Sequence, residues 1–154
     1  MKLNFTIYIF LLSCTAVFTF LPGNARAASC TVTTTSVNFG LYDPFQATVN
    51  DVNGRITVSC TSKGRFTIAL STGQSGSYTT RYMLSGGTTD QLDYNLYTNN
   101  ARTIIWGDGT GGTRVVRRRF RNNTKRVTVH GRIPAMQNIS PGSYSDNIVA
   151  TVNF

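Results

Sequence analysis

The sequence predicts an all-β protein whose strands pack as a sandwich, with a barrel as the less favoured alternative. Charged residues make up only 14% of the 154-residue chain and there is no glutamate, a composition that disfavours long helices. Most apolar runs alternate with polar residues at period two, and no stretch has a 3.6-residue apolar period. Turn-forming Gly, Asn and Asp residues separate these runs at short intervals, as in sandwiches and barrels.

The N-terminal segment, residues 1–27, is typical of a secretory signal peptide. Lys2 precedes an apolar run at residues 7–21, and Ala25-Arg26-Ala27 forms a small-residue cleavage site. We therefore expect an exported protein whose mature chain, residues 28–154, is a single domain. Without Lys2 and Arg26, 13 of the 15 basic residues remain against 6 acidic ones, a net charge of +7.

Two other interpretations of this segment are less favoured. A membrane anchor would need about 20 apolar residues, so we expect no transmembrane segment in the mature chain. Residues 11–14 weakly resemble a lipoprotein signal, but the hydrophobic residues continue past Cys14.

Two cysteines, Cys30 and Cys60, remain in the mature chain. An even number of cysteines in an exported protein favours a disulfide over two buried thiols. A bridge that closes a loop of about 30 residues would stabilise the fold by roughly 3–4 kcal/mol on the loop-entropy estimate.

Alternating runs mark the strands along the chain. Residues 30–39 are rich in β-formers, and residues 55–60 and 65–71 alternate clearly on either side of Lys63-Gly64, which predicts a hairpin. The same criteria predict further strands at residues 81–84, 91–97, 103–106 and 125–133.

The last run of the sequence is an apolar strand without a polar tail. Its inward positions at period two are Ile148, Ala150, Val152 and Phe154. Because chain ends are normally solvated, we expect this strand to lie inside a sheet.

Few residues are suited to catalysis or metal binding. His130 falls within a strand, and Asp90 and Asp93 lie at the start of another. The loop at residues 107–112 has neither a following lysine for phosphate nor, beside Asp108, the carboxylates that calcium needs. We expect no enzymatic activity, no cofactor and no metal.

Residues 114–126 form a strongly basic segment. Its cations are Arg114, Arg117, Arg118, Arg119, Arg121, Lys125 and Arg126. We favour a solvated hairpin around Asn122-Asn123 whose charges protect a sheet edge. The alternative is a salt-sensitive, sequence-blind attraction to a polyanion such as nucleic acid, acidic polysaccharide or lipopolysaccharide phosphate.

Short motifs spread over most of the mature chain resemble the spore coat protein U domain family, the fold unit of archaic chaperone–usher pilus subunits. They lie at residues 30–32, 38–40, 42–44, 58–61, 67–73, 81–84, 92–97, 106–111, 131–135 and 142–146, followed by the final strand. The resemblance fades between Gly112 and Val127, where Arg and Lys predominate.

This resemblance implies an immunoglobulin-like sandwich that lacks its last strand. The first and final strands would flank a groove, with Ile148, Ala150, Val152 and Phe154 in its wall. The final strand would pair on both sides once the groove is filled. A periplasmic pilus chaperone and then a neighbouring pilus subunit, at an outer-membrane usher, would fill it by β-augmentation. The implied role is a structural subunit of a surface fibre, with no specific nucleic acid partner. The alternatives are a self-folding module that binds polyanions or carbohydrate, and a coat or matrix protein that packs without an usher.

The expected start of the mature chain also bears on fibre assembly. A donated strand needs on the order of ten residues, whereas only Ala28 and Ser29 would precede Cys30. We therefore expect a subunit that accepts a strand but donates none. Cleavage near Ala16 would instead retain residues 17–21 as a candidate donor.

Overall fold

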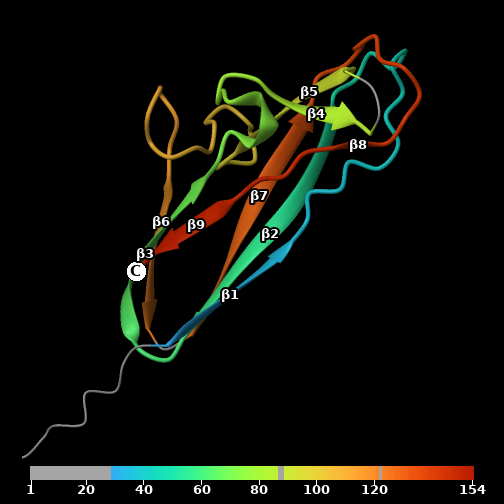
Figure 1. The fold of residues 1–154 in the computed structure, drawn as a ribbon. Helices are drawn as coiled ribbons and strands as arrows, with labels where there is room; N and C mark the ends of the chain where they lie inside the picture. The colour runs from blue at the N-terminus through green and yellow to red at the C-terminus, as the bar shows by residue number, and fades with distance from the viewer. Residues whose placement is uncertain (1–28, 87–88, 122) are drawn as a thin grey trace, which may run out of the picture.

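The computed structural model describes residues 29–154, apart from 87–88 and 122, and is a two-layer β-sandwich (Figure 1). The predicted signal peptide and mature start at Ala28 lie outside these residues. The strands are β1 (Cys30–Thr35), β2 (Asn50–Cys60), β3 (Lys63–Leu70), β4 (Arg81–Ser85), β5 (Gln91–Tyr97), β6 (Val116–Arg121), β7 (Thr124–Ile133), β8 (Tyr144–Ser145) and β9 (Ala150–Asn153), with a 3-10 turn η1 (Gly73–Ser75).

Two antiparallel sheets form the layers. The large sheet has the order β1-β2-β7-β5-β4-β8, and the small sheet has the order β6-β3-β9. Strand β1 is therefore one edge of the large sheet, while β6 and β9 are the two edges of the small sheet. The predicted all-β sandwich is confirmed.

The core lies between the inner faces of the two sheets. Alternate residues of each long strand are buried there, as the period-two pattern predicts. Trp106 is completely buried and donates its indole N–H to the carbonyl of Ile68 at 3.0 Å, so the loop after β5 is fixed against the small sheet. The predicted Cys30–Cys60 disulfide is present and joins β1 to β2.

The predicted hairpin of residues 55–60 and 65–71 is wrong. Strand β2 pairs with β1 and β7, whereas β3 pairs with β6 and β9. Both strands have an apolar inner face because they face each other across the core, and this arrangement gives the same alternation as a paired hairpin.

The predicted hairpin around Asn122-Asn123 is wrong for the same reason, since β6 belongs to the small sheet and β7 to the large one. Residues 103–106 form only isolated bridges, Tyr97 to Ile105 and Trp106 to Arg114. The strands predicted at residues 81–84, 91–97 and 125–133 are confirmed as β4, β5 and β7.

The final strand is confirmed, but it pairs on one side only. Strand β9 begins at Ala150 and hydrogen-bonds to β3, and among the described residues no strand lies along its other edge. The subunit therefore meets the expectation of a strand inside a sheet on one side of β9 only. Pairing on the other side needs an inserted strand and stays a prediction.

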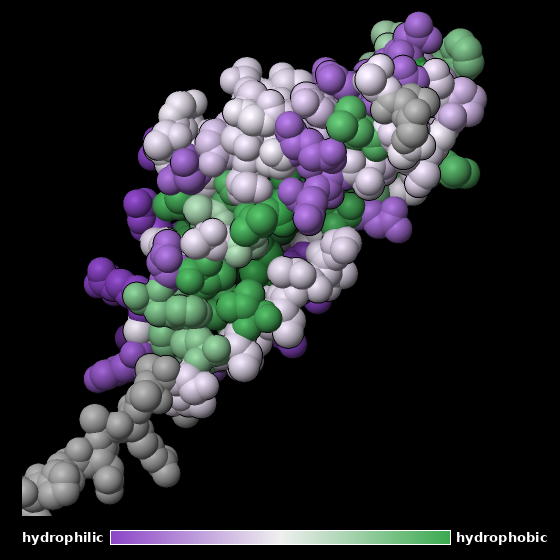
Figure 2. Space-filling model, in the orientation of Figure 1, coloured by the Kyte–Doolittle hydropathy of each residue, from purple (hydrophilic) through white to green (hydrophobic). Residues whose placement is uncertain are grey.

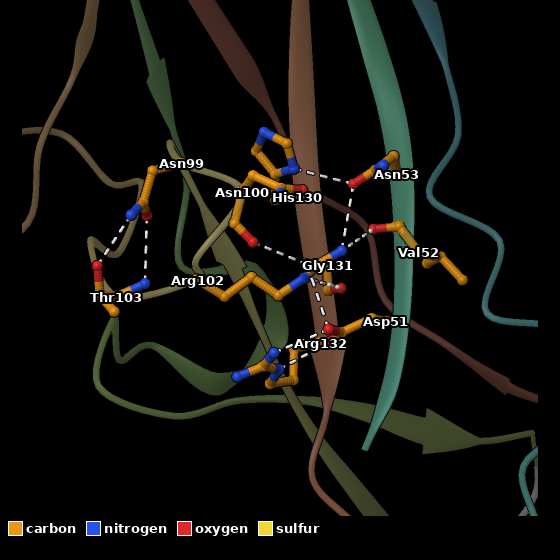
Figure 3. A network of polar contacts seen from close by, with 10 residues as sticks. All are labelled: Asp51, Val52, Asn53, Asn99, Asn100, Arg102, Thr103, His130, Gly131 and Arg132. Carbon is orange, nitrogen blue, oxygen red and sulfur yellow. Dashed lines mark hydrogen bonds and ion pairs between the residues drawn. The ribbon is translucent and has the colours of Figure 1, made fainter. Parts of the chain in front are cut away.

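A polar network fastens the loop after β5 to the outside of the large sheet (Figure 3). Arg102 forms an ion pair with Asp51 at 3.2 Å and donates to the carbonyl of Gly131 at 3.0 Å. Arg132 donates two hydrogen bonds to the same carboxylate, at 2.7 and 2.8 Å. These contacts give the back of the large sheet a fixed geometry.

Candidate partner-binding groove

The unpaired edges of β1 and β9 border the same hollow, and the two strands run in opposite directions (Figure 1). Each is the last strand of its sheet, so nothing among the described residues closes the sandwich between them. We call the channel between these two edges the groove. A strand inserted there would run antiparallel to one wall and parallel to the other.

The register of β9 shows which of its backbone groups face the groove. Ser71 N–H donates to the carbonyl of Val149 at 2.9 Å, in line with the pairing of Leu70 with Ala150. Opposed residues of an antiparallel pair alternate between bonded and non-bonded positions. Thr151 therefore bonds to β3, while Ala150 and Val152 direct their N–H and C=O groups into the groove.

The backbone groups of β1 also point alternately towards its partner strand and into the groove. Thr61 N–H donates to the carbonyl of Ser29 at 3.0 Å, in register with the pairing of Cys30 with Cys60. Because hydrogen-bonded and non-hydrogen-bonded positions alternate along the strand, the N–H and C=O groups of Cys30, Val32 and Thr34 point away from β2. Both walls thus offer free main-chain donors and acceptors to an incoming strand.

The groove contains an apolar hollow. The hollow, of about 320 Å³, lies between Thr34 of β1 and Ala150 of β9. Its floor includes the buried core residues Ile56, Leu70 and Val129, and half-buried apolar side chains such as Ile148 form its rim. Figure 2 shows hydrophobic residues as a stripe between β9 and β1. An apolar hollow beside two unpaired strand edges suits a segment of another chain.

Further hollows extend this channel at both ends. One of about 450 Å³ adjoins Cys30, Phe120 and Phe154. Another of about 790 Å³ lies at the opposite end, against Phe39 and Tyr144. A row of hollows suits an extended strand, whose alternate side chains point the same way every two residues.

The predicted wall residues lie on β9 and on the segments directly before and after it. Ile148, Ala150 and Val152 are half-buried and pack against the core. Phe154 is 63% exposed, but its ring centroid lies 6.4 Å from that of Phe66 and 6.5 Å from that of Phe120.

One segment of the chain already fills part of the channel. Val37 and Phe39, just after β1, pack on the inner face of the large sheet where β2 has Gly54 and β7 has Gly131. A Cβ atom at Gly54 would lie 2.7 Å from a methyl group of Val37, and one at Gly131 would lie 2.8 Å from the Phe39 ring. The two glycines thus provide the space for this segment.

A carboxylate holds the C-terminal wall in place. Asp146 accepts a hydrogen bond of 2.6 Å from the Tyr94 hydroxyl and one of 2.9 Å from the N–H of Gln74. Burial, together with the hydrogen bond to Asp146, raises the pKa of Tyr94 above its usual value, so the hydroxyl stays a donor. The segment before β9 is thereby tied to β5 and η1.

Arg81 is a structural residue that sequence analysis missed. It is completely buried and donates to the carbonyl of Ser71 at 2.8 Å, to that of Trp106 at 2.8 Å and to the Asn95 side chain at 2.6 Å. Burial lowers its pKa, and the hydrogen bonds compensate for the lost hydration. Nothing in the sequence indicates that an arginine at the start of a strand, such as Arg81, is buried.

The basic segment does not form one surface. Arg117, Arg119 and Arg121 are exposed on the outer face of β6. Arg118 has the inward register of its buried neighbours but is exposed at the sheet edge. The remaining cations lie apart: Arg114 precedes β6, and Lys125 and Arg126 belong to β7 in the other sheet.

The other candidate groups have structural contacts. His130 contacts the Asn53 side chain at 2.9 Å (Figure 3), and its pKa is lowered by burial and by Arg102. In the loop at residues 107–112, Asp108 accepts hydrogen bonds from the backbone and hydroxyl of Thr110. No group of three or more His, Cys, Asp or Glu side chains is placed to hold a metal in the described part of the chain.

The fold and groove together define a class of protein: a disulfide-linked β-sandwich with one open seam. The sequence model of the Spore Coat Protein U domain matches residues 15–151. The chain therefore belongs to the Spore Coat Protein U domain family. Consistently, it is 33% identical over 132 residues to Protein U of Myxococcus xanthus, covering 77% of this chain and 72% of that protein. The family match begins within the predicted signal peptide.

One solved structure shows the same fold. One chain of the CsuC–CsuE chaperone–tip adhesion subunit pre-assembly complex, from archaic chaperone–usher Csu pili of Acinetobacter baumannii, matches with a TM-score of 0.61 and 18% identity. The match covers 83% of this chain and 40% of that one. HdaB, the minor tip subunit of the E. coli Hda pilus, matches with a TM-score of 0.43 and 14% identity, covering 79% of each chain.

In the described part of the chain, no helix has the length and apolar character that a membrane span requires.

Proposed function

We propose that this protein is an exported, non-enzymatic structural subunit of an archaic chaperone–usher pilus, assembled by donor-strand complementation. The groove carries this proposal. Two unpaired strand edges border an apolar hollow, and no described segment of the chain completes the sandwich between them. An inserted strand would satisfy both edges through main-chain hydrogen bonds, and its alternate side chains would fill the hollows.

In this proposal the partners act in sequence. A periplasmic pilus chaperone inserts a strand while the subunit is in the periplasm, and a neighbouring pilus subunit replaces it at the outer-membrane usher. Membership of the Spore Coat Protein U domain family and the fold shared with a chain of a chaperone–subunit complex support this assignment. The finished fibre would lie at the cell surface and serve adhesion.

The direct test compares the full chain exported alone with the chain co-expressed with a pilus chaperone. We expect the subunit alone to self-associate or be degraded, because it exposes core and strand edges. With the chaperone we expect a soluble complex of one copy of each. A stable folded monomer that captures no chaperone would contradict the proposal and favour a self-folding coat or binding module.

We further propose that the subunit accepts a strand but donates none, as suits a fibre end or an accessory position. This depends on a mature start at Ala28. N-terminal sequencing of the exported protein measures that start. Retention of residues 17–27 would supply a candidate donor and restore a repeating shaft role.

A further inference from the structure

The outer face of the small sheet carries a concentration of positive charge. Its cations come from two neighbouring strands: Lys63 and Arg65 from β3, and Arg117, Arg119 and Arg121 from β6. All five side chains are exposed. Figure 2 shows hydrophilic residues projecting from the margin of the molecule where β6 lies in Figure 1. We call this set of five residues the cationic face.

The charges of the cationic face are not balanced within the chain. Lys63 stands directly opposite Arg121, and Arg65 directly opposite Arg119. Like charges in directly opposed positions destabilise a sheet. None of the six aspartates lies on β3, β6 or β9, and among the described residues no carboxylate forms an ion pair with any of the five cations.

Protection of a sheet edge does not account for this arrangement. Charges on β6 suffice to discourage pairing along the free edge of that strand. Strand β3, however, is the central strand of the small sheet and has β6 on one side and β9 on the other. Lys63 and Arg65 therefore extend the charge from the edge to the middle of the sheet, where no edge needs protection.

We propose that the cationic face binds a linear acidic polysaccharide. Alternate residues of a strand lie about 6.6 Å apart and neighbouring strands about 4.8 Å apart, so the cations form two parallel rows on a flat surface. Such rows suit an extended polymer with repeating carboxylate or sulfate groups. Guanidinium groups bind these anions through paired hydrogen bonds.

The remaining residues of the face favour a polysaccharide over other polyanions. The other outward-facing positions of the small sheet are Thr67, Ala69, Thr151 and Asn153. No aromatic ring is available there for base stacking, which single-stranded nucleic acid binding uses. No large apolar side chain is present there to enter a lipid bilayer.

This binding goes beyond the proposed assembly and is independent of it. The groove is reached from the inner face of the small sheet and from the edge of β9, whereas the cationic face is the outer surface of β3 and β6. A strand inserted in the groove leaves that outer surface open. A fibre subunit would thus hold its neighbour through one face of the sheet and a surface polymer through the other.

The test uses the full exported chain, as a chaperone complex or alone, whichever form is stable. Binding to alginate, heparin, a single-stranded oligonucleotide and anionic phospholipid vesicles is measured over a range of salt concentrations. We expect binding to alginate, heparin or both that weakens steeply with salt. Alginate reports carboxylate recognition and heparin reports sulfate recognition. Tighter binding to the oligonucleotide or the vesicles would overturn the proposal.

Two double variants with the same loss of charge locate the site. R65Q/R119Q removes an opposed pair from the cationic face, whereas R114Q/R126Q removes exposed arginines of the basic segment that lie off it. We expect about tenfold weaker binding and a shallower salt dependence for the first, and less than about twofold change for the second. If the two double variants lost polysaccharide binding equally, the polymer would be attracted by net charge alone. That result would contradict a binding site on the cationic face.

Folding of each variant is checked by its intact disulfide and circular dichroism. If R65Q/R119Q does not fold, the single variant Arg119→Gln replaces it, and we expect its affinity for the polysaccharide to fall about threefold. Absence of binding to both polysaccharides at about 50 mM salt would also overturn the proposal. Complex formation with the chaperone should be unaffected by all of these variants, so this test and that of the proposed function can fail separately.

Discussion

The two edges of the small sheet flank the same central strand but have opposite character. Strand β6 reads VRRRFR and carries four arginines, one of them in an inward register, whereas β9 reads ATVN and carries no charge. An unpaired edge attracts other strands, and charged side chains are a common protection against this. The chain protects one edge and leaves the other open beside the apolar hollow of the groove. The open edge is therefore the one suited to a partner strand.

The largest expected effect comes from placing a charge on the open edge. Val152→Asp would put a carboxylate on the groove side of β9, where an inserted strand would desolvate it. We expect loss of the chaperone complex, with a penalty on the order of 5 kcal/mol. Co-purification with the chaperone measures it.

Thr151→Asp is the matched control, because Thr151 is exposed on the outer face of the same strand. This variant should retain the complex. If both variants behaved alike, the groove side of β9 would have no special role.

The next largest effect concerns the other wall of the groove. Replacing both Cys30 and Cys60 by serine removes the bridge between β1 and β2, and should lower the free energy of unfolding by roughly 3–4 kcal/mol. Urea unfolding of the two proteins in the chaperone-bound form measures the difference. Two free thiols in the intact mass of exported wild-type protein would contradict the structure.

Removing a charge from the protected edge should have a smaller effect. Arg118 shares its register with Val116 and Phe120, so Arg118→Val completes an apolar inner row on β6. We expect self-association at about tenfold lower concentration, equivalent to about 1.4 kcal/mol. Sedimentation of the chaperone-bound form, in which the groove is filled, measures it. Unchanged association would indicate that the other arginines protect β6 without Arg118.

The smallest expected effect lies far from both edges, in the network of Figure 3. The hydrogen bond from Arg132, with the charge of Arg102, lowers the pKa of Asp51 below 3.8, although burial opposes this shift. Asp51→Asn should reduce stability by about 1 kcal/mol at pH 7.

The pH dependence of this effect has a definite sign. Because the folded pKa of Asp51 lies below the unfolded one, its contribution is complete above pH 3.8 and lost as the pH falls through the folded value. The difference between wild type and Asp51→Asn should therefore shrink on acidification. A difference that grows with acid would exclude the ion pair as its cause.

The strands and their inward faces could be predicted from the sequence, but the assignment of strands to sheets could not. Alternation at residues 55–60 and 65–71 reports that one face of each strand is buried. It does not report whether the two strands are neighbours in one sheet or face each other across the core. The hairpin predicted in the basic segment is wrong for the same reason, because two strands that are close in the sequence can belong to different sheets, as β6 and β7 do.

The groove was predicted in part. The family resemblance and the alternation pointed to Ile148, Ala150 and Val152 as a wall. The buried Arg81 and the anchoring carboxylate of Asp146 depend on contacts between residues far apart in sequence. Lys63 and Arg65 could have been added to the cationic residues from the outward positions of β3, but only the register places them opposite the arginines of β6.

Backbone amide exchange along β9 tests the open edge most directly, at the level of single N–H groups. In the subunit alone, freshly released from the chaperone and dilute enough that it has not yet associated, the amide of Thr151, bonded to β3, should exchange slowly. Those of Ala150 and Val152, which face the groove, should exchange fast. In the chaperone complex, or in the assembled fibre, all three should exchange slowly. Fast exchange at Ala150 and Val152 in every form would contradict strand insertion at this edge.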